Sequence, residues 1–288
     1  MKNCCKKGIF LSLSAALLLS GAALQFSSGF SLSKIVIDLP KEPSKSSNSF
    51  EISGPYRYLS HGRQSFVFES ADRKSVIKFF NQKYFRPRWY RVFLRSKKAR
   101  RKYDKKISLR KKFYETSYFL AMKEMQKETG IIYIHLSNTQ ASLPTVELID
   151  SSGRTILVDL NQTAFVIQKK ATPYLSYMEE ISQKEGTDGL KKEIDRWLSF
   201  SSRRIEKGIF DKDHDIWSNT GVLDGEVVCI DPGRYYVEEN KTDPALLELE
   251  WWKATHRLYK WLLTNNLNAA SYLYQKTTDL CHLQPPIE

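Results

Sequence analysis

The chain has 288 residues, of which 41% are hydrophobic and 27% charged, and its formal net charge at pH 7 is +13. This length and hydrophobicity allow a sizeable core in one large domain or two lobes. Only four cysteines are present, and Cys4 and Cys5 precede the first apolar run, which excludes a disulfide scaffold. The positive charge indicates an anionic partner or surface.

Residues 1–33 are predicted to be a signal peptide or a membrane anchor. Lysines at the start precede an uncharged stretch, rich in Leu and Ala, that runs to Ser33. Small residues at 20–22 suit cleavage by a signal peptidase, whereas the length of the uncharged stretch suits a retained single-pass anchor. Because the positive charges precede the span, the body is expected outside the cytoplasm, either anchored or exported.

A polar linker is expected at 34–49, where the sequence is rich in Ser and contains Pro. The folded body is predicted to begin near Phe50.

Alternating apolar residues predict two strands at 56–59 and 66–69, with Gly62 and Ser65 in the turn between them. Small residues there would let backbone N–H groups approach an anion. The apolar strand that follows carries one lysine, Lys78, which would supply a positive charge to phosphates. The plainer interpretation is a structural hairpin.

The most basic part of the chain is an insertion at 83–112. Fourteen basic residues lie within 86–112, and Asp104 alone opposes them. Aromatic residues are interleaved, namely Trp89, Tyr90 and Phe93. This composition predicts an amphipathic segment that binds an anionic membrane surface or an acidic protein, with nucleic acid the weaker alternative. The plainer interpretation is a solvated insertion whose charge aids solubility.

Helical spacing predicts a long helix from Asp104 to Gly130. Apolar runs then predict four strands, at 131–136, 144–150, 154–160 and 163–168. Two helices are expected beyond a Lys-Lys-Ala-Thr-Pro junction, at 174–184 and 188–207.

An acidic loop and a hairpin follow the second of these helices. The loop carries Asp211, Asp213 and Asp215 and ends at Asn219. The Asp224-Gly225 pair between apolar runs predicts a β-hairpin that ends at Asp231. Carboxylates and an amide at the end of a strand suit Mg²⁺, which takes oxygen ligands and often keeps phosphate oxygens as partners. The plainer interpretation is a polar hairpin with a solvated turn.

Four of these segments, in this order, resemble the motifs of the protein kinase-like superfamily. The stretch 59–67 resembles the glycine-rich loop, and Val76-Ile77-Lys78 resembles the Val-Ala-Ile-Lys strand. The loop 213–219 and the stretch 230–233 fall where the catalytic loop and the Asp-Phe-Gly motif are expected. The resemblance covers roughly Phe50 to Val237.

The resemblance implies an α+β fold with two lobes. The N-lobe, 50–170, would combine an antiparallel sheet with one long helix. The C-lobe, 171–288, would be reduced and mainly helical. Its last helices are predicted at 246–263 and 268–281, the first of them after a capping Asp243 and a Pro.

The resemblance also implies a Mg²⁺–ATP site. Its residues would be Gly62, Ser65 and Lys78 for the nucleotide, Asn219 and Asp231 for the metal, and Asp213 as the base that accepts a proton from the attacking hydroxyl. Glu115 of the long helix would pair with Lys78. The sequence leaves open Asp215 or His214 as the base, and Glu124 in place of Glu115.

Departures from the kinase pattern concern activity more than fold. Ser60 replaces the first loop glycine, Pro232 replaces the usual aromatic residue, and no Ala-Pro-Glu motif follows. Two main hypotheses result: a phosphotransferase acting at or beyond a membrane, or a catalytically inactive pseudokinase that docks through its basic insertion. A third is an unrelated α+β secreted protein. The phosphate acceptor and the oligomeric state stay open.

Overall fold

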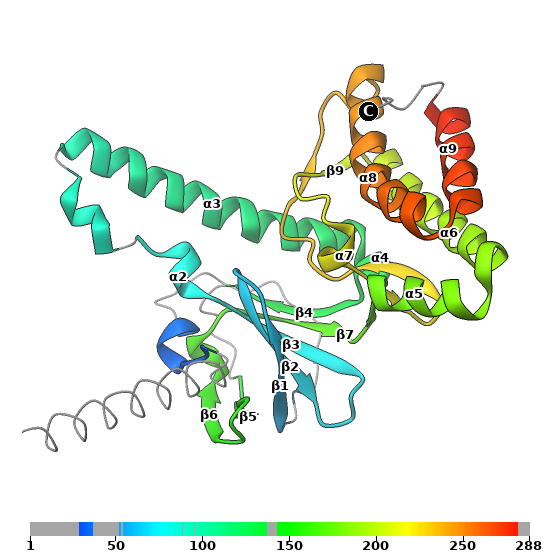
Figure 1. Ribbon diagram of the computed structural model, residues 1–288. Helices are drawn as coiled ribbons and strands as arrows, with labels where there is room; N and C mark the ends of the chain where they lie inside the picture. Colours follow the sequence, from blue (N-terminus) through cyan, green and yellow to red (C-terminus); the bar gives the residue numbers. More distant parts are fainter. Residues whose placement is uncertain are drawn as a thin grey trace, which may run out of the picture. The chain divides into compact units, whose positions relative to one another are not determined.

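The computed structural model describes residues 29–36, 52, 54–87, 89–94, 96–136 and 143–281 (Figure 1). The chain divides into two compact units, the first formed by Met1–Arg88 with His135–Ile167 and the second by Trp89–Ile134 with Gln168–Glu288. Most of the expected signal peptide or anchor, and most of the expected linker, lie outside the described residues. No described helix is both long enough and apolar enough to cross a bilayer.

The first unit is built on a β-sheet. Its strands are β1 (Tyr56–His61), β2 (Ser65–Ser70), β3 (Ser75–Phe80), β5 (Thr145–Ile149), β6 (Thr155–Asp159) and β7 (Phe165–Lys169). With β4 (Ile131–His135) the sheet has seven strands in the order β4-β7-β3-β2-β1-β5-β6. All six residues of β3 are buried, including the polar Ser75 and Lys78. The fold is therefore α+β, as predicted.

The pairing within this sheet is not antiparallel throughout. Strands β1, β2 and β3 form an antiparallel meander, but β1 pairs with β5 in parallel, Tyr56 opposite Leu148. The expectation of a wholly antiparallel sheet is wrong at this pair. The reason is connectivity: a long stretch of chain separates β1 from β5, and such a crossover can deliver a strand in parallel.

Residues 29–36, which fall within the predicted leader and linker, pack in the first unit. The Phe30 ring lies edge-on to Phe66 and Phe68, with ring centroids 5.3 and 5.0 Å apart. After the short 3₁₀ helix η1 (Leu32–Lys34), Ile35 is fully buried. Val36 then forms a β-bridge with Thr163.

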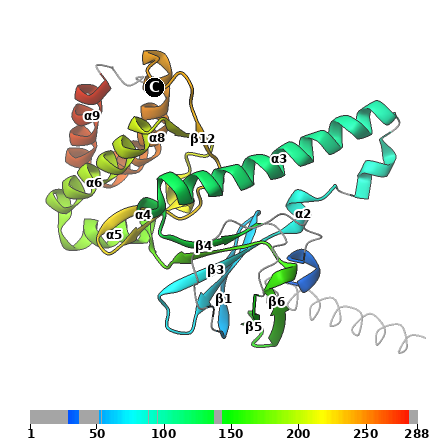
Figure 2. The same cartoon turned by 180° about the vertical axis from the view of Figure 1, so that it is seen from behind.

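The second unit is mainly helical. Its helices are the 3₁₀ helix η2 (Trp89–Phe93), α3 (Lys97–Glu124), α4 (Gln126–Thr129), α5 (Tyr174–Lys184), α6 (Gly186–Glu206), α7 (Ile216–Asn219), α8 (Pro244–Asn265) and α9 (Leu267–Cys281). Helix α8 packs against α6 and α9, and the three lie side by side in both views (Figures 1 and 2). The predicted start of α8 is confirmed, since the Asp243 side chain accepts the N–H of Ala245 at 2.9 Å.

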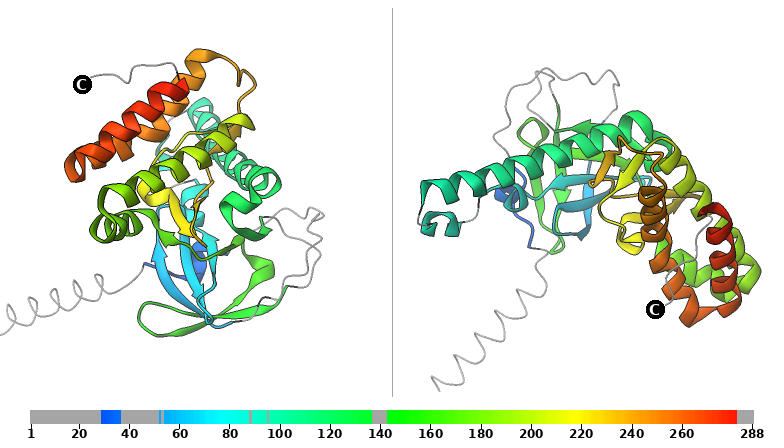
Figure 3. Two further views of the ribbon diagram at one scale, coloured as in Figure 1. Left: turned by 90° about the vertical axis from the view of Figure 1, so that its right-hand side faces the viewer. Right: turned by 90° about the horizontal axis from the view of Figure 1, so that it is seen from above.

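Helix α3 begins earlier than predicted and is unbroken along its 28 residues (Figure 3). The Ser96 hydroxyl caps it by accepting the N–H of Ala99 at 3.0 Å. Ten of the fourteen basic residues of 86–112 therefore lie in the first half of α3. The short helices α2 (Gln82–Phe85) and η3 (Leu160–Gln162) belong to the first unit.

Two small sheets position the acidic loop in the second unit. One pairs β8 (Thr172–Pro173), β10 (Thr220–Leu223) and β11 (Glu226–Cys229), and the other pairs β9 (Ile209–Asp211) with β12 (Tyr235–Val237). The predicted hairpin is confirmed: Leu223 pairs with Glu226 around Asp224 and Gly225, whose φ angles are +52° and +80°. Positive φ at both central residues is what a type I′ turn requires.

Candidate functional site

The acidic loop runs from β9 through α7 and is fixed by aromatic packing. The Trp217 ring stacks on Tyr174 of α5 at 6.2 Å and lies 5.9 Å from Trp261 of α8. Ile216 is buried beneath it. This anchoring gives Asp213, just upstream, a defined position.

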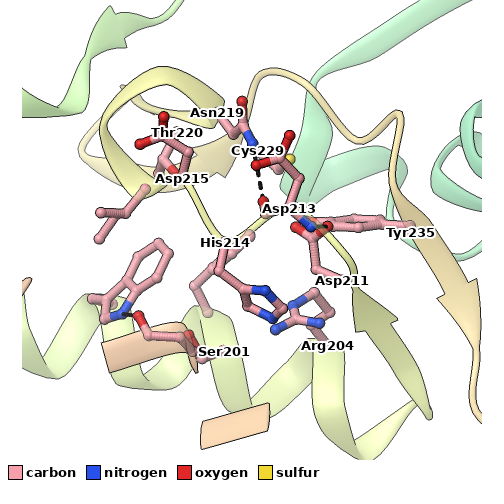
Figure 4. Close-up of a pocket in the computed structure, with 14 residues that line it drawn as sticks. Ser201, Arg204, Asp211, Asp213, His214, Asp215, Asn219, Thr220, Cys229 and Tyr235 are labelled. Carbon is pink, nitrogen blue, oxygen red and sulfur yellow. Dashed lines mark hydrogen bonds between the residues drawn. The ribbon is translucent and has the colours of Figure 1, made fainter. Parts of the chain in front are cut away.

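Asn219 links the loop to the residues that follow β11, Ile230 and Asp231. Its side-chain amide donates to the backbone carbonyl of Asp213 at 3.0 Å, the contact drawn in Figure 4. The backbone carbonyl of Asn219 accepts the backbone N–H of Ile230 at 2.7 Å and that of Asp231 at 3.3 Å. The structure therefore brings Asp213, Asn219 and Asp231 together within the second unit.

Three donors converge on one oxygen of Asp231. Oδ1 accepts the hydroxyls of Tyr114 at 3.2 Å and Tyr118 at 3.1 Å, both from α3, and the N–H of Gly233 at 3.2 Å. Tyr118 is buried, and burial beside this carboxylate raises the pKa of its hydroxyl well above the usual range. The Tyr118 hydroxyl thus stays protonated, and both tyrosine hydroxyls orient Asp231 by donating to it.

Gly233 is required for this arrangement. A Cβ at this position would lie 2.1 Å from the Tyr114 ring, a distance that real side chains do not adopt. The Asp-Pro-Gly sequence therefore ends in glycine because the backbone passes directly against an aromatic ring.

A buried charge cluster lies beneath the loop. One carboxylate oxygen of Glu250 on α8, Oε1, makes three contacts. It accepts hydrogen bonds from the Arg204 guanidinium at 2.6 Å and from the backbone N–H of Asp211 at 3.0 Å, and it lies 3.2 Å from His214 Nε2. Figure 4 shows the His214 ring beside Arg204. Against the desolvation that burial imposes, these partners hold the pKa of Glu250 at about 2.

Asp211 behaves in the opposite way. Removal from water raises its pKa to about 6, against the lowering effect of Arg204 and of the backbone N–H of Asp213, which its Oδ1 accepts at 2.8 Å. The Asp211 carboxyl thus serves as a structural acceptor that fixes the start of the loop.

The other two loop aspartates differ in their surroundings. The Asp215 carboxylate forms an ion pair with Arg257 of α8 at 2.6 Å. Among the residues that the structure describes, Asp213 is in none of the ion pairs, and its side chain is partly exposed. His214 is turned toward Glu250. Of the three alternatives for the base, Asp215 and His214 each have a charged partner, whereas Asp213 has no ion pair in the described part of the chain.

A small cavity of about 30 Å³ lies within this group of residues. Its lining includes Ser201, Arg204, Asp211, Asp213, His214 and Asn219 (Figure 4). A volume of this size holds about two waters, which need polar partners. The cavity is too small for a nucleotide.

The predicted nucleotide residues lie in the first unit. Lys78 of β3 is buried, 7% exposed, and pairs with Val67 of β2. The Gly62 N–H donates to the Ser65 carbonyl at 2.9 Å and closes the turn, and a Cβ on Gly62 would meet open space. Beside the turn lies an open hollow of about 480 Å³ lined by His61, Gly62, Arg63, Asn81, Lys83 and Tyr84.

Glu115 and Glu124 both lie on α3, in the second unit. The Glu115 carboxylate is 3.7 Å from Lys111 one turn earlier, and Glu124 is 3.0 Å from Lys123. Partly exposed pairs of this kind contribute little to stability. A role for either glutamate toward Lys78 stays a prediction.

The residues fit a magnesium ion held with a nucleotide better than a site made of protein ligands alone. Across residues 29–36, 52, 54–87, 89–94, 96–136 and 143–281, no group of three or more His, Cys, Asp and Glu side chains could hold a metal. Mg²⁺ is usually bound by one or two carboxylates together with phosphate oxygens and water. Asn219 and Asp231, whose backbones are joined by the hydrogen bond of 3.3 Å, carry one amide and one carboxylate of the kind such an ion takes.

Several residues of the site were not found from the sequence. They are Tyr114, Tyr118, Arg204, Glu250 and Arg257. Arg204 and Glu250 lie on otherwise apolar helix faces, and a charged residue at such a position indicates a buried partner. The two tyrosines are spaced i, i+4, so they share one face of α3.

Comparisons with known proteins found no matching family model and no significant match among curated proteins. Solved structures of WbdD are similar in part. A high-resolution (2.2 Å) crystal structure shares 12% identity at a TM-score of 0.40 and covers 78% of this chain and 46% of WbdD. A co-crystal structure of WbdD with the kinase inhibitor LY294002 shares 14% identity at a TM-score of 0.37 and covers 77% of this chain and 45% of WbdD.

A medium-resolution structure of the bifunctional kinase-methyltransferase WbdD shares 13% identity at a TM-score of 0.35. It covers 75% of this chain and 43% of WbdD. The chain thus spans less than half the length of each WbdD chain. The function proposed below depends on this chain's own residues.

Proposed function

We propose that the chain is a kinase-like phosphotransferase that uses Mg²⁺ and ATP and acts at or beyond a membrane. The observation that carries the proposal is the adjacency of Asn219 and Asp231, joined by a backbone hydrogen bond of 3.3 Å. The amide of Asn219 also holds the Asp213 carbonyl at 3.0 Å. A candidate base and two candidate metal ligands thus share one loop and one strand end.

The proposed roles follow from the chemistry of each group. Mg²⁺, when bound, would neutralise charge on the phosphate oxygens. Asn219 and Asp231 would hold the ion through their oxygens, and Asp213 would accept the proton of the attacking hydroxyl. Lys78 would bring a positive charge to the phosphates, with Gly62 and Ser65 in the turn that covers them.

The test is a calorimetric titration of the full chain with Mg²⁺–ATP. Asp231→Asn is compared with Asp224→Asn, a change at an exposed turn aspartate whose positive φ suits asparagine. We expect the wild type and Asp224→Asn to bind, and Asp231→Asn to lose binding while remaining folded. At 100 times its Kd the ligand would stabilise the fold by about 2.7 kcal/mol, so melting curves report the same result.

Absence of binding at millimolar ATP in every variant would overturn this proposal. The three donors on Asp231 Oδ1 favour a second candidate in that case. The carboxylate would then be an acceptor that joins α3 to the hairpin, and the fold would be a pseudokinase that acts by binding.

A further inference from the structure

The first half of α3 concentrates the positive charge of the protein. Lys97 to Lys112 contains ten basic residues and one aspartate, a net +9 out of +13 for the whole chain. No residue from Lys97 to Lys106 is buried, and the first buried side chain of the helix is Ile107. This half of the helix therefore presents its charges to solvent.

Large apolar side chains are exposed among these charges. Phe93 is 69% exposed, Val92 63% and Leu109 57%. A shallow hollow of about 550 Å³ lies on the same segment, lined by Leu94, Ala99, Lys102, Tyr103, Lys105, Lys106 and Leu109. An apolar surface bordered by lysines differs from a merely solvated helix face.

The exposed apolar residues are held in place on the helix. The Arg91 guanidinium makes a two-pronged contact with the Asp104 carboxylate, with Nε 2.6 Å from Oδ1. The Arg100 guanidinium donates to the carbonyls of Leu94 at 3.0 Å and Val92 at 3.1 Å. Helix η2 is thereby fixed against α3, so Val92 and Phe93 do not have to be ordered when they meet a partner.

We propose that η2 and the first half of α3 form a docking surface for an anionic lipid bilayer. Lysine and arginine would contact the headgroups while Phe93, Val92 and Leu109 enter the boundary between headgroups and acyl chains. Nucleic acid is the less suitable partner, because phosphate contacts use the cations but leave this apolar surface exposed to water. The proposal rests on residues separate from those of the proposed phosphotransferase site.

Hydrogen exchange of the full chain measures this docking directly. The chain is mixed with vesicles of phosphatidylcholine alone or of phosphatidylcholine with one quarter phosphatidylglycerol. We expect amide exchange at 89–94 and in the first turns of α3 to slow with the anionic vesicles and not with the neutral ones. Reading these amides separates docking of the helix from any attachment through the apolar N-terminal run.

Two pairs of variants test charge and apolar contact. Lys102, Lys105 and Lys106 are changed together to Gln, and the matched control changes the exposed Lys184, Lys192 and Lys260, so both proteins have the same net charge. Each basic residue near an anionic bilayer is worth roughly five-fold in binding, so the first variant should need roughly 100-fold more lipid for half-maximal protection. Phe93→Ser should weaken protection, and Phe119→Ser, 53% exposed outside the basic half, should not.

Three results would overturn the proposal. One is equal protection with neutral and anionic vesicles. Another is protection that the two lysine variants lose to the same degree. The third is stronger protection by duplex DNA than by anionic vesicles, unaffected by Phe93→Ser, which would assign the surface to nucleic acid.

Discussion

At the scale of single residues, Gly233 has the tightest steric constraint in the candidate site. Gly233→Ala would force the Tyr114 ring away, since the new Cβ would lie 2.1 Å from it. We expect a loss of about 1–3 kcal/mol in the free energy of unfolding and weaker binding of Mg²⁺–ATP, because Tyr114 orients Asp231. Chemical denaturation and calorimetry measure both.

Gly62→Ala is the matched control for this change. A Cβ on Gly62 meets nothing within 4 Å, so its stability should equal that of the wild type. Equal stability of Gly233→Ala and Gly62→Ala would contradict the packing described around Tyr114.

Asp211 carries a prediction about pH. Its folded pKa, about 6, lies above its ordinary value of 3.8, so between these values the folded state binds more protons than the unfolded state. This group therefore makes the wild type less stable as pH rises from about 4 to 6. Asp211→Asn removes that dependence and should be about 1–2 kcal/mol more stable than wild type at pH 7, with the difference shrinking toward pH 4.

Urea denaturation at pH 4, 5, 6 and 7 measures this difference. A gap between the two proteins that stays constant with pH would mean that the Asp211 carboxyl does not titrate in the folded state as described. The control is Asp224→Asn, at an exposed turn position.

At the scale of secondary-structure elements, Glu250 joins α8 to α6 and to the start of the acidic loop. Glu250→Gln removes the counter-charge of Arg204, whose side chain is 4% exposed, and a buried charge left unpaired costs about 3–5 kcal/mol. The exposed Glu248→Gln on the same helix should be neutral. Chemical denaturation measures the free energy of unfolding of both variants. Equal stability of Glu250→Gln and Glu248→Gln would show that the cluster does not hold these elements together.

The elements themselves could largely be predicted from local sequence. Alternation and turn chemistry gave the strands β1, β2 and β3 and the hairpin at Asp224-Gly225, because both depend on neighbouring residues. Helix α3 begins at Lys97, earlier than the predicted Asp104. The Ser96 hydroxyl caps it there, and the lysines that follow are helical although they show no apolar periodicity.

The candidate site could be predicted less completely than the elements. Asp213, Asn219 and Asp231 lie close in sequence, so their grouping follows from one loop and one hairpin. The contacts of Asp231 with Tyr114 and Tyr118, and of Arg204 with Glu250, join residues far apart in the chain. Such contacts depend on how the helices pack, which local patterns do not encode.

At the scale of the whole molecule, Phe30 and Ile35 pack in the same compact unit as β1. The stretch 37–51 connects Val36, bridged to Thr163, with the start of β1 in the same unit. Because both ends of this stretch belong to one unit, the entropic cost of bringing them together on folding varies slowly with the number of residues between them, by about 0.6 kcal/mol per doubling.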